Sequence, residues 1–206
     1  MANKKIDYEG RPLKKYPYIG VCGLDCGLCP RYYTKGSSRC PGCAGPSFSL
    51  KHPTCSFITC CVKEKNLEVC AECVDFPCSK FKSAKEYDQV KESTSYPSYK
   101  KALPNLYCIQ KHGIESFVKF QKKRIILLEK MLKDFDDGRS RSYFCKASIF
   151  LDPKVLNDSL NKALQKIKTD KIKQQDLKSK AKILKSLLTN HTSRLQLGSV
   201  FKEQQV

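Results

Sequence analysis

Cysteine placement constrains this 206-residue chain more than any other feature. All but two of its thirteen cysteines lie between Cys22 and Cys78, in stretches such as CGLDCGLCP and CPGC where Gly and Pro are dense. Helical periodicity is poor there, apart from a possible short helix between Cys55 and Cys70. Such a segment buries little apolar surface, so cross-links must stabilise it. The sequence predicts a small metal-stapled, loop-rich N-terminal module.

The compartment decides what these thiols can do. The N-terminal sequence MANKKIDYEG lacks the apolar stretch and cleavage site of a secretory signal. No apolar run approaches the ~20 residues that span a bilayer. We therefore expect a cytoplasmic protein that does not associate with a membrane. A reducing cytosol disfavours disulfides, and an odd number of cysteines cannot be fully paired, so metal ligation is the preferred interpretation.

Three C-x-x-C pairs point to metal binding, since a tight turn directs two thiolates at one tetrahedral metal. Cys26–Cys29 and Cys40–Cys43 are separated by ten residues and would complete one four-thiolate site. Cys70–Cys73, with two neighbouring cysteines, would build a second site. The candidates for those two neighbours are Cys55, Cys60, Cys61 and Cys78, so spacing predicts two metal centres.

Several alternatives stay open at this level. Adjacent Cys60 and Cys61 should point apart, which favours Cys60 as the ligand, and His52 is a possible substitute ligand. Zinc is the expected metal, but thiolates also suit iron. The C-x3-C-x2-C spacing of Cys22, Cys26 and Cys29 matches that of radical enzymes holding a [4Fe–4S] cluster. The β/α alternation of those enzymes is missing, which leaves a simpler iron–sulfur protein as the alternative. How the cysteines are shared among sites is not fixed by spacing.

Beyond residue 80 the pattern becomes helical. Apolar residues recur at helical spacing over residues 114–135, 151–168 and 176–188, and a Pro-interrupted helical stretch covers residues 97–113. Residues 195–201 could form a short strand. We predict a cysteine-rich metal-binding module at residues 1–80 and a mainly α-helical bundle at residues 81–206.

The net charge of +19 bears on partners. Such a field attracts polyanions, so nucleic acid is a possible partner, with a partner protein or a merely solvated surface as alternatives. The lysines suited to phosphate contact are expected on the last two helices: Lys166, Lys173, Lys178 and Lys182. No His/Glu pair lies near the cysteines as a general base. A binding module is therefore favoured over the alternative, an iron–sulfur redox protein or enzyme.

The strings CGLDCGLCP, CPGC and CAECVDFPCSKF resemble a cysteine-rich prokaryotic family known as DUF3795. A later segment, DDGRSRSYFC, is similar to part of its longer members, so the resemblance covers about residues 18–150. It implies a metal-binding protein, presumed to bind zinc, with no assigned reaction. The resemblance implies ten family positions as the predicted ligands, and Cys61 is an addition. We expect two centres, with two thiols to spare, drawn from these ten: Cys22, Cys26, Cys29, Cys40, Cys43, Cys55, Cys60, Cys70, Cys73 and Cys78.

Overall fold

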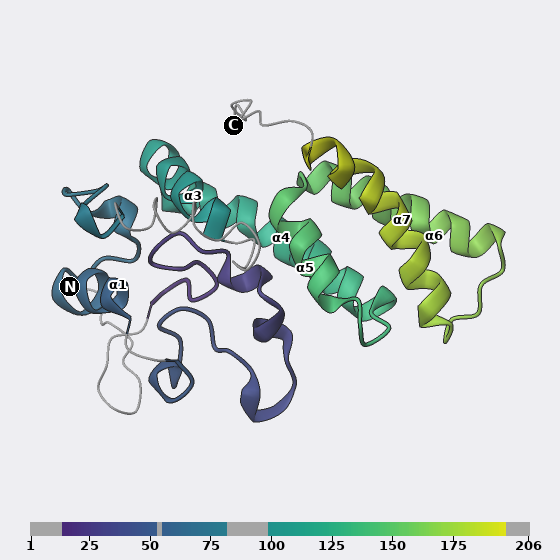
Figure 1. Cartoon of the computed structure of the whole chain (residues 1–206), viewed down its shortest axis with the longest axis horizontal. Helices are drawn as coiled ribbons and strands as arrows, with labels where there is room; N and C mark the ends of the chain where they lie inside the picture. The colour runs from purple at the N-terminus through teal and green to yellow at the C-terminus, as the bar shows by residue number, and fades with distance from the viewer. Residues whose placement is uncertain (1–13, 53–54, 82–98, 197–206) are drawn as a thin grey trace. The chain divides into compact units, whose positions relative to one another are not determined.

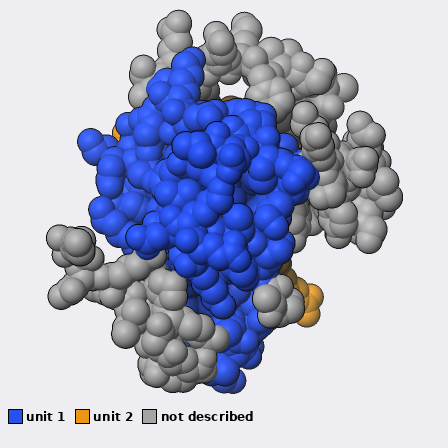
Figure 2. Space-filling view, turned by 90° about the vertical axis from the view of Figure 1, so that its left-hand side faces the viewer, with its two compact units in different colours: residues 1–122 blue, residues 123–206 orange. Residues whose placement is uncertain are grey.

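The computed structural model describes residues 14–52, 55–81 and 99–196. Within these ranges the chain is mainly helical and contains no strand. It divides into two compact units, residues 1–122 and residues 123–206, coloured separately in Figure 2. The stretch expected to form a short strand lies outside the described residues from Leu197 onward.

Unit 1 begins as a chain of loops and short helical turns. Between Cys55 and Cys70 the predicted short helix is confirmed: α1, Ser56–Ile58, continues into a π-helical turn, Thr59–Glu64. The remaining turns are 3₁₀ turns, at Cys26–Leu28, Pro30–Tyr33, Gly36–Ser38, Phe48–Leu50, Cys70–Glu72 and Ser79–Phe81. The loop-rich character expected from Gly and Pro is therefore present.

One helix and the first part of a second, up to Lys122, complete unit 1. Helix α3, Tyr99–His112, contains Pro104, and α4 runs over Ile114–Phe135, the range that periodicity predicts. They add four buried side chains to the core beneath the cysteines: Leu106, Ile109, Phe117 and Val118. The loops contribute their own buried side chains, including Ile19, Val21, Val62, Val69 and Phe76. The cysteine-rich segment thus shares a larger apolar core than its own sequence indicates.

Buried hydrogen bonds hold the first cysteine loop to these helices. The Asn105 side chain of α3 donates to the Gly23 carbonyl at 2.8 Å. The Gln121 side chain of α4 donates to Oδ1 of Asp25 at 2.9 Å, and Asp25 is 1 % exposed. The loop that carries Cys22 and Cys26 is therefore positioned by residues about a hundred positions away. The predicted boundary at residue 80 stays a prediction, since the compact units record packing and not independent folding.

Unit 2 contains α5, Arg141–Phe150, α6, Pro153–Thr169, and α7, Leu177–Gln196. Helices α6 and α7 pack side by side (Figure 1). The predicted start of α6 is confirmed: the Asp152 side chain accepts from the Lys154 N–H at 2.7 Å, with Pro153 at the first helical position. Sequence periodicity did not identify α5, because it is short and no side chain caps its N-terminus.

A buried arginine closes the C-terminus of α5. Nε of Arg124 donates to the Ser148 carbonyl at 2.7 Å, and Nη2 donates to the Ile149 carbonyl. Arg124 is only 4 % exposed, so its removal leaves two terminal carbonyls without this donor. We expect Arg124→Leu to lower the free energy of unfolding of unit 2 by about 2 kcal/mol, measured by urea denaturation. Lys130→Leu, at an exposed position of the same helix, should have little effect, and equal losses in the two variants would contradict this account.

None of the helices in the described ranges is both long enough and apolar enough to cross a bilayer.

Candidate metal centre

Eleven cysteines of unit 1 fall into three groups, with Cys108 outside them, and no disulfide joins any of the chain's thirteen cysteines. The inner group contains Cys22, Cys26, Cys43 and Cys55. The outer group contains Cys29, Cys40 and His52. The cavity group contains Cys60, Cys61, Cys70, Cys73 and Cys78. The inner and outer groups each bring together residues that are separated in sequence, Cys26 with Cys43 and Cys40 with His52.

In the inner group, Cys26 and Cys43 share a hydrogen bond. The Val21 N–H also donates to Sγ of Cys43, at 3.3 Å. The hydrogen bond from Cys26 lowers the pKa of Cys43 to about 7, while the same contact and burial raise the pKa of Cys26. Burial, followed by the charge of Cys43, raises the pKa of Cys22 to about 12. The first thiolate of this group therefore forms at Cys43, beside a backbone donor that stabilises it.

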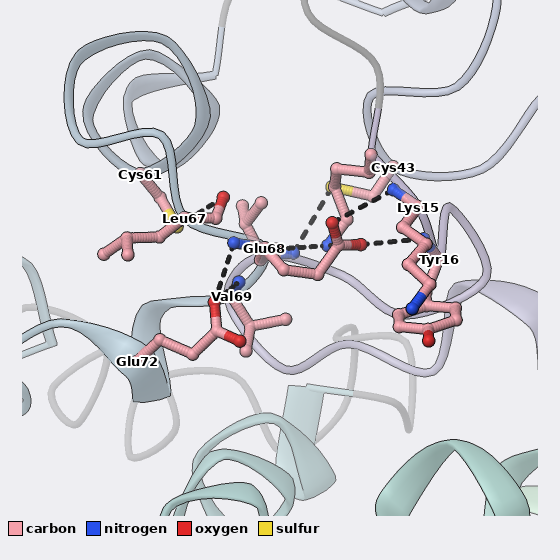
Figure 3. Close-up of polar contacts among 10 residues, drawn as sticks. Lys15, Tyr16, Cys43, Cys61, Leu67, Glu68, Val69 and Glu72 are labelled. Carbon is pink, nitrogen blue, oxygen red and sulfur yellow. Dashed lines mark hydrogen bonds and ion pairs between the residues drawn. The ribbon is translucent and has the colours of Figure 1, made fainter. Parts of the chain in front are cut away.

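A carboxylate network joins the segment before Cys22 to the segment before Cys70 (Figure 3). Glu68 accepts from the Tyr16 N–H at 2.7 Å and from the Lys15 N–H at 3.0 Å. Nζ of Lys14, whose side chain is fully buried, donates to the Glu68 carbonyl at 2.5 Å and lies 3.5 Å from Oε1 of Glu68. The network fixes a buried cation whose charge favours the thiolate forms of Cys43 and Cys61.

Five cysteines line a cavity of about 200 Å³, together with Phe57, Phe76 and Phe81. They come from the π-helical turn, the Cys70–Glu72 turn and the following loop. The Cys61 thiol donates to Cys70 or accepts from it, and this contact lowers the pKa of Cys61 while it raises that of Cys70. Nζ of Lys65 donates to Sγ of Cys73 at 3.1 Å and to Asp75 at 2.5 Å. Sulfur therefore dominates a cavity that also holds a positive charge.

Cys61 is the residue that sequence reasoning undervalued. We expected Cys60 and Cys61 to point apart, but both line the same cavity. Both residues lie in the π-helical turn Thr59–Glu64. The adjacency of the two cysteines was the available signal.

In the outer group, Sγ of Cys40 lies 3.1 Å from Nε2 of His52. Burial, followed by the charge of Arg31, lowers the pKa of His52, which favours the neutral imidazole that binds metals. Burial also raises the pKa of Cys29, and the neighbouring Cys40 raises it further. The sequence alone indicated His52 as a possible substitute ligand, and in the structure it directly contacts Cys40, a predicted ligand.

The grouping differs from the arrangement expected from spacing. Spacing placed both of the first C-x-x-C pairs in one site, whereas Cys26 contacts Cys43, and Cys29 lies near Cys40. Across residues 14–52, 55–81 and 99–196, no three Cys, His, Asp or Glu side chains already stand in a metal-binding arrangement. The ten predicted ligands therefore stay a prediction. Their donor chemistry fits zinc or iron, since soft thiolates dominate each group.

The fold and the three groups define a mainly helical protein with a cysteine-rich N-terminal segment. Residues 18–83 match the sequence model of the family described as protein of unknown function (DUF3795), which supports the family assignment of this segment. The match ends before residue 84, so it does not extend to the resemblance expected up to residue 150. No curated protein and no solved structure matches the chain.

Proposed function

We propose that the cysteine-rich segment is a metal-binding module in which thiolates hold structural Zn²⁺. The cavity group would hold one ion through Cys60 or Cys61 with Cys70, Cys73 and Cys78, and the inner group would hold another. Such sites use all four coordination positions for protein ligands, so the ion stabilises the fold and the module acts in binding. The alternative is an iron–sulfur protein with a redox or enzymatic role.

One observation carries this proposal: five cysteines from three segments line one cavity of about 200 Å³. Charge supports it as well, since a zinc ion held by four thiolates carries a formal charge of −2. Lys65 beside Cys73 and the buried Lys14 near Cys43 each place a cation where it offsets part of that charge. Each cation is also paired with a carboxylate, Lys14 with Glu68 and Lys65 with Asp75, so it offsets only part of that charge.

Elemental analysis of protein purified without oxygen tests the proposal. We expect zinc and no acid-labile sulfide, and we expect Cys78→Ser to remove about one zinc per chain, because it deletes a cavity ligand. Cys108→Ser, on α3 and outside the three groups, is the matched control and should leave the zinc content unchanged. Iron with acid-labile sulfide would favour the alternative, and metal-free protein with intact thiols would reject both.

A second candidate function, binding of a polyanion, is favoured by the α6–α7 hairpin. The four predicted lysines are all exposed, with Lys166 on α6 and Lys178 and Lys182 on α7. The sequence placed Lys173 on a helix, but it lies in the connection between the two. Lys162, Lys168 and Lys171 are also exposed nearby, which concentrates positive charge at this hairpin.

Charge reversal at this hairpin distinguishes a binding surface from a solvated one. We expect Lys178→Glu with Lys182→Glu to weaken binding to a nucleic-acid probe and to reduce the salt dependence of the affinity. The double variant Lys130→Glu with Lys133→Glu has the same net charge but changes exposed positions on α4. A gel-shift series over salt concentration measures both. Equal losses in the two variants, or no complex at low salt, would reject the surface as a specific site.

A further inference from the structure

The outer group is already close to the geometry of two ligands on one metal. Tetrahedral zinc with Zn–S of ~2.3 Å and Zn–N of ~2.0 Å separates the two donor atoms by about 3.5 Å. Sγ of Cys40 and Nε2 of His52 are 3.1 Å apart, so a shift of a few tenths of an ångström would admit the ion. The distance itself fits a hydrogen bond, whose proton the metal would replace.

The His52 ring is held in place by its neighbours. It stacks on Phe48, with ring centroids 4.4 Å apart and an angle of 13° between the planes. The backbone N–H of His52 donates to the Phe48 carbonyl at 3.0 Å. The Nζ of Lys51 donates to the Arg39 carbonyl, at 2.8 Å, and so ties the His52 turn to the residue before Cys40. A ligand with a fixed orientation loses less conformational entropy when a metal binds.

Cys29 is the natural third donor. The Cys40 N–H donates to the Arg31 carbonyl at 2.9 Å, and the Tyr32 N–H donates to the Cys29 carbonyl at 3.0 Å, so the turn after Cys29 is joined to Cys40. From Cys26 to Lys63 the chain contains no Asp or Glu. The donors that this loop supplies to a metal are therefore sulfur and imidazole nitrogen, which zinc binds well.

We propose that Cys29, Cys40 and His52 hold a separate Zn²⁺ with one coordination position left for an exchangeable ligand. This rests on the proposed zinc-binding function and deepens it, because it assigns the two thiols that the cavity and inner groups leave over. Three protein ligands are the arrangement that keeps a fourth position open. All three side chains are partly exposed, and the loop also carries the exposed cations Arg31, Arg39 and Lys51. The fourth ligand is therefore water or a small anion.

Metal release from the full-length protein is the first test. An open site transfers its ion to a chelating dye faster than a closed four-thiolate site, because the dye can enter the open position. We expect one equivalent of zinc to leave the wild-type protein in a fast phase. His52→Gln should abolish this fast phase and lower the zinc content by about one ion per chain. His191→Gln, on α7, is the matched control and should keep both the fast phase and the zinc content.

Cadmium NMR is the second test, and it observes the ligand directly. In protein loaded with ¹¹³Cd²⁺, Nε2 of His52 should show scalar coupling to one cadmium resonance, which requires a bond between the two atoms. His52→Cys should restore the ion that His52→Gln loses and shift this resonance toward the range of sulfur-rich sites. The two other histidines, His112 and His191, should show no coupling.

The outcomes separate this inference from the proposed function. If the wild-type protein contains zinc and Cys78→Ser lowers its zinc content, the zinc module is supported. If His52→Gln leaves the zinc content unchanged in the same experiment, the third site is overturned. Absence of cadmium coupling at His52 in fully loaded protein overturns it as well. Wild-type protein without any metal would reject both proposals together.

Discussion

Removal of zinc by a strong chelator is expected to unfold the cysteine-rich segment, with a loss of stability on the order of 10 kcal/mol for each structural ion. The expected loss is large because the loop that carries Cys22 and Cys26 has little regular structure of its own, and metal removal breaks the bonds that would join its thiolates to other segments. The shared core with α3 and α4 offsets only part of this loss. Far-UV circular dichroism and thermal melting with and without chelator measure the effect, and unit 2 should keep its helical signal.

Single substitutions localise this effect. Cys43→Ser should reproduce much of the loss, since Cys43 accepts from Val21 and contacts Cys26. Cys108→Ser is the control because Cys108 lies on α3, outside the three groups, and should be mild. Chelated protein with an unchanged far-UV signal and melting temperature would contradict a structural role for the metal.

The helices that could be predicted from the sequence are those in which apolar residues recur at helical spacing because one face of the helix is buried. Residues 114–135 and the start of α6 at Pro153 were predicted because apolar spacing and an N-cap pair are local signals. Helix α5 is too short for a periodic pattern, and its closing contact comes from Arg124, which lies on another helix. A local pattern cannot report a cap that is supplied from a distant position.

In the candidate site too, local features could be predicted from the sequence and long-range contacts could not. Spacing could point to the C-x-x-C turns as candidate ligands, because a C-x-x-C turn is a local feature, and these ligands stay a prediction. It did not identify the partners, since Cys26 meets Cys43 and Cys29 lies near Cys40 only after the loops have folded. Likewise, nothing near Gly23 in the sequence indicates that α3 approaches its backbone. Partner choice is a long-range property, and it depends on the shared core of unit 1.

Because α3 approaches the backbone at Gly23, we expect a small substitution at this position to cause a large loss of stability. Gly23 has φ of 87°, and a Cβ built there would lie 2.0 Å from the carbonyl oxygen of Ala102 on α3. Gly23→Ala must therefore displace either α3 or the loop between Cys22 and Cys26. We expect a loss of about 4 kcal/mol in the stability of unit 1, combining the cost of a left-handed alanine with that of the overlap.

Gly36→Ala provides the matched control, because Gly36 has a similar φ of 76° with no atom within 4 Å of its added Cβ. It carries the backbone cost of about 1 kcal/mol and none of the overlap. Urea denaturation of both variants gives the difference, which is the cost of separating the cysteine loop from α3. Gly23→Ala should also lower zinc content, since the displaced loop carries Cys22 and Cys26. Equal losses of stability in the two variants would mean that α3 does not position this loop, and the inner group would then need another support.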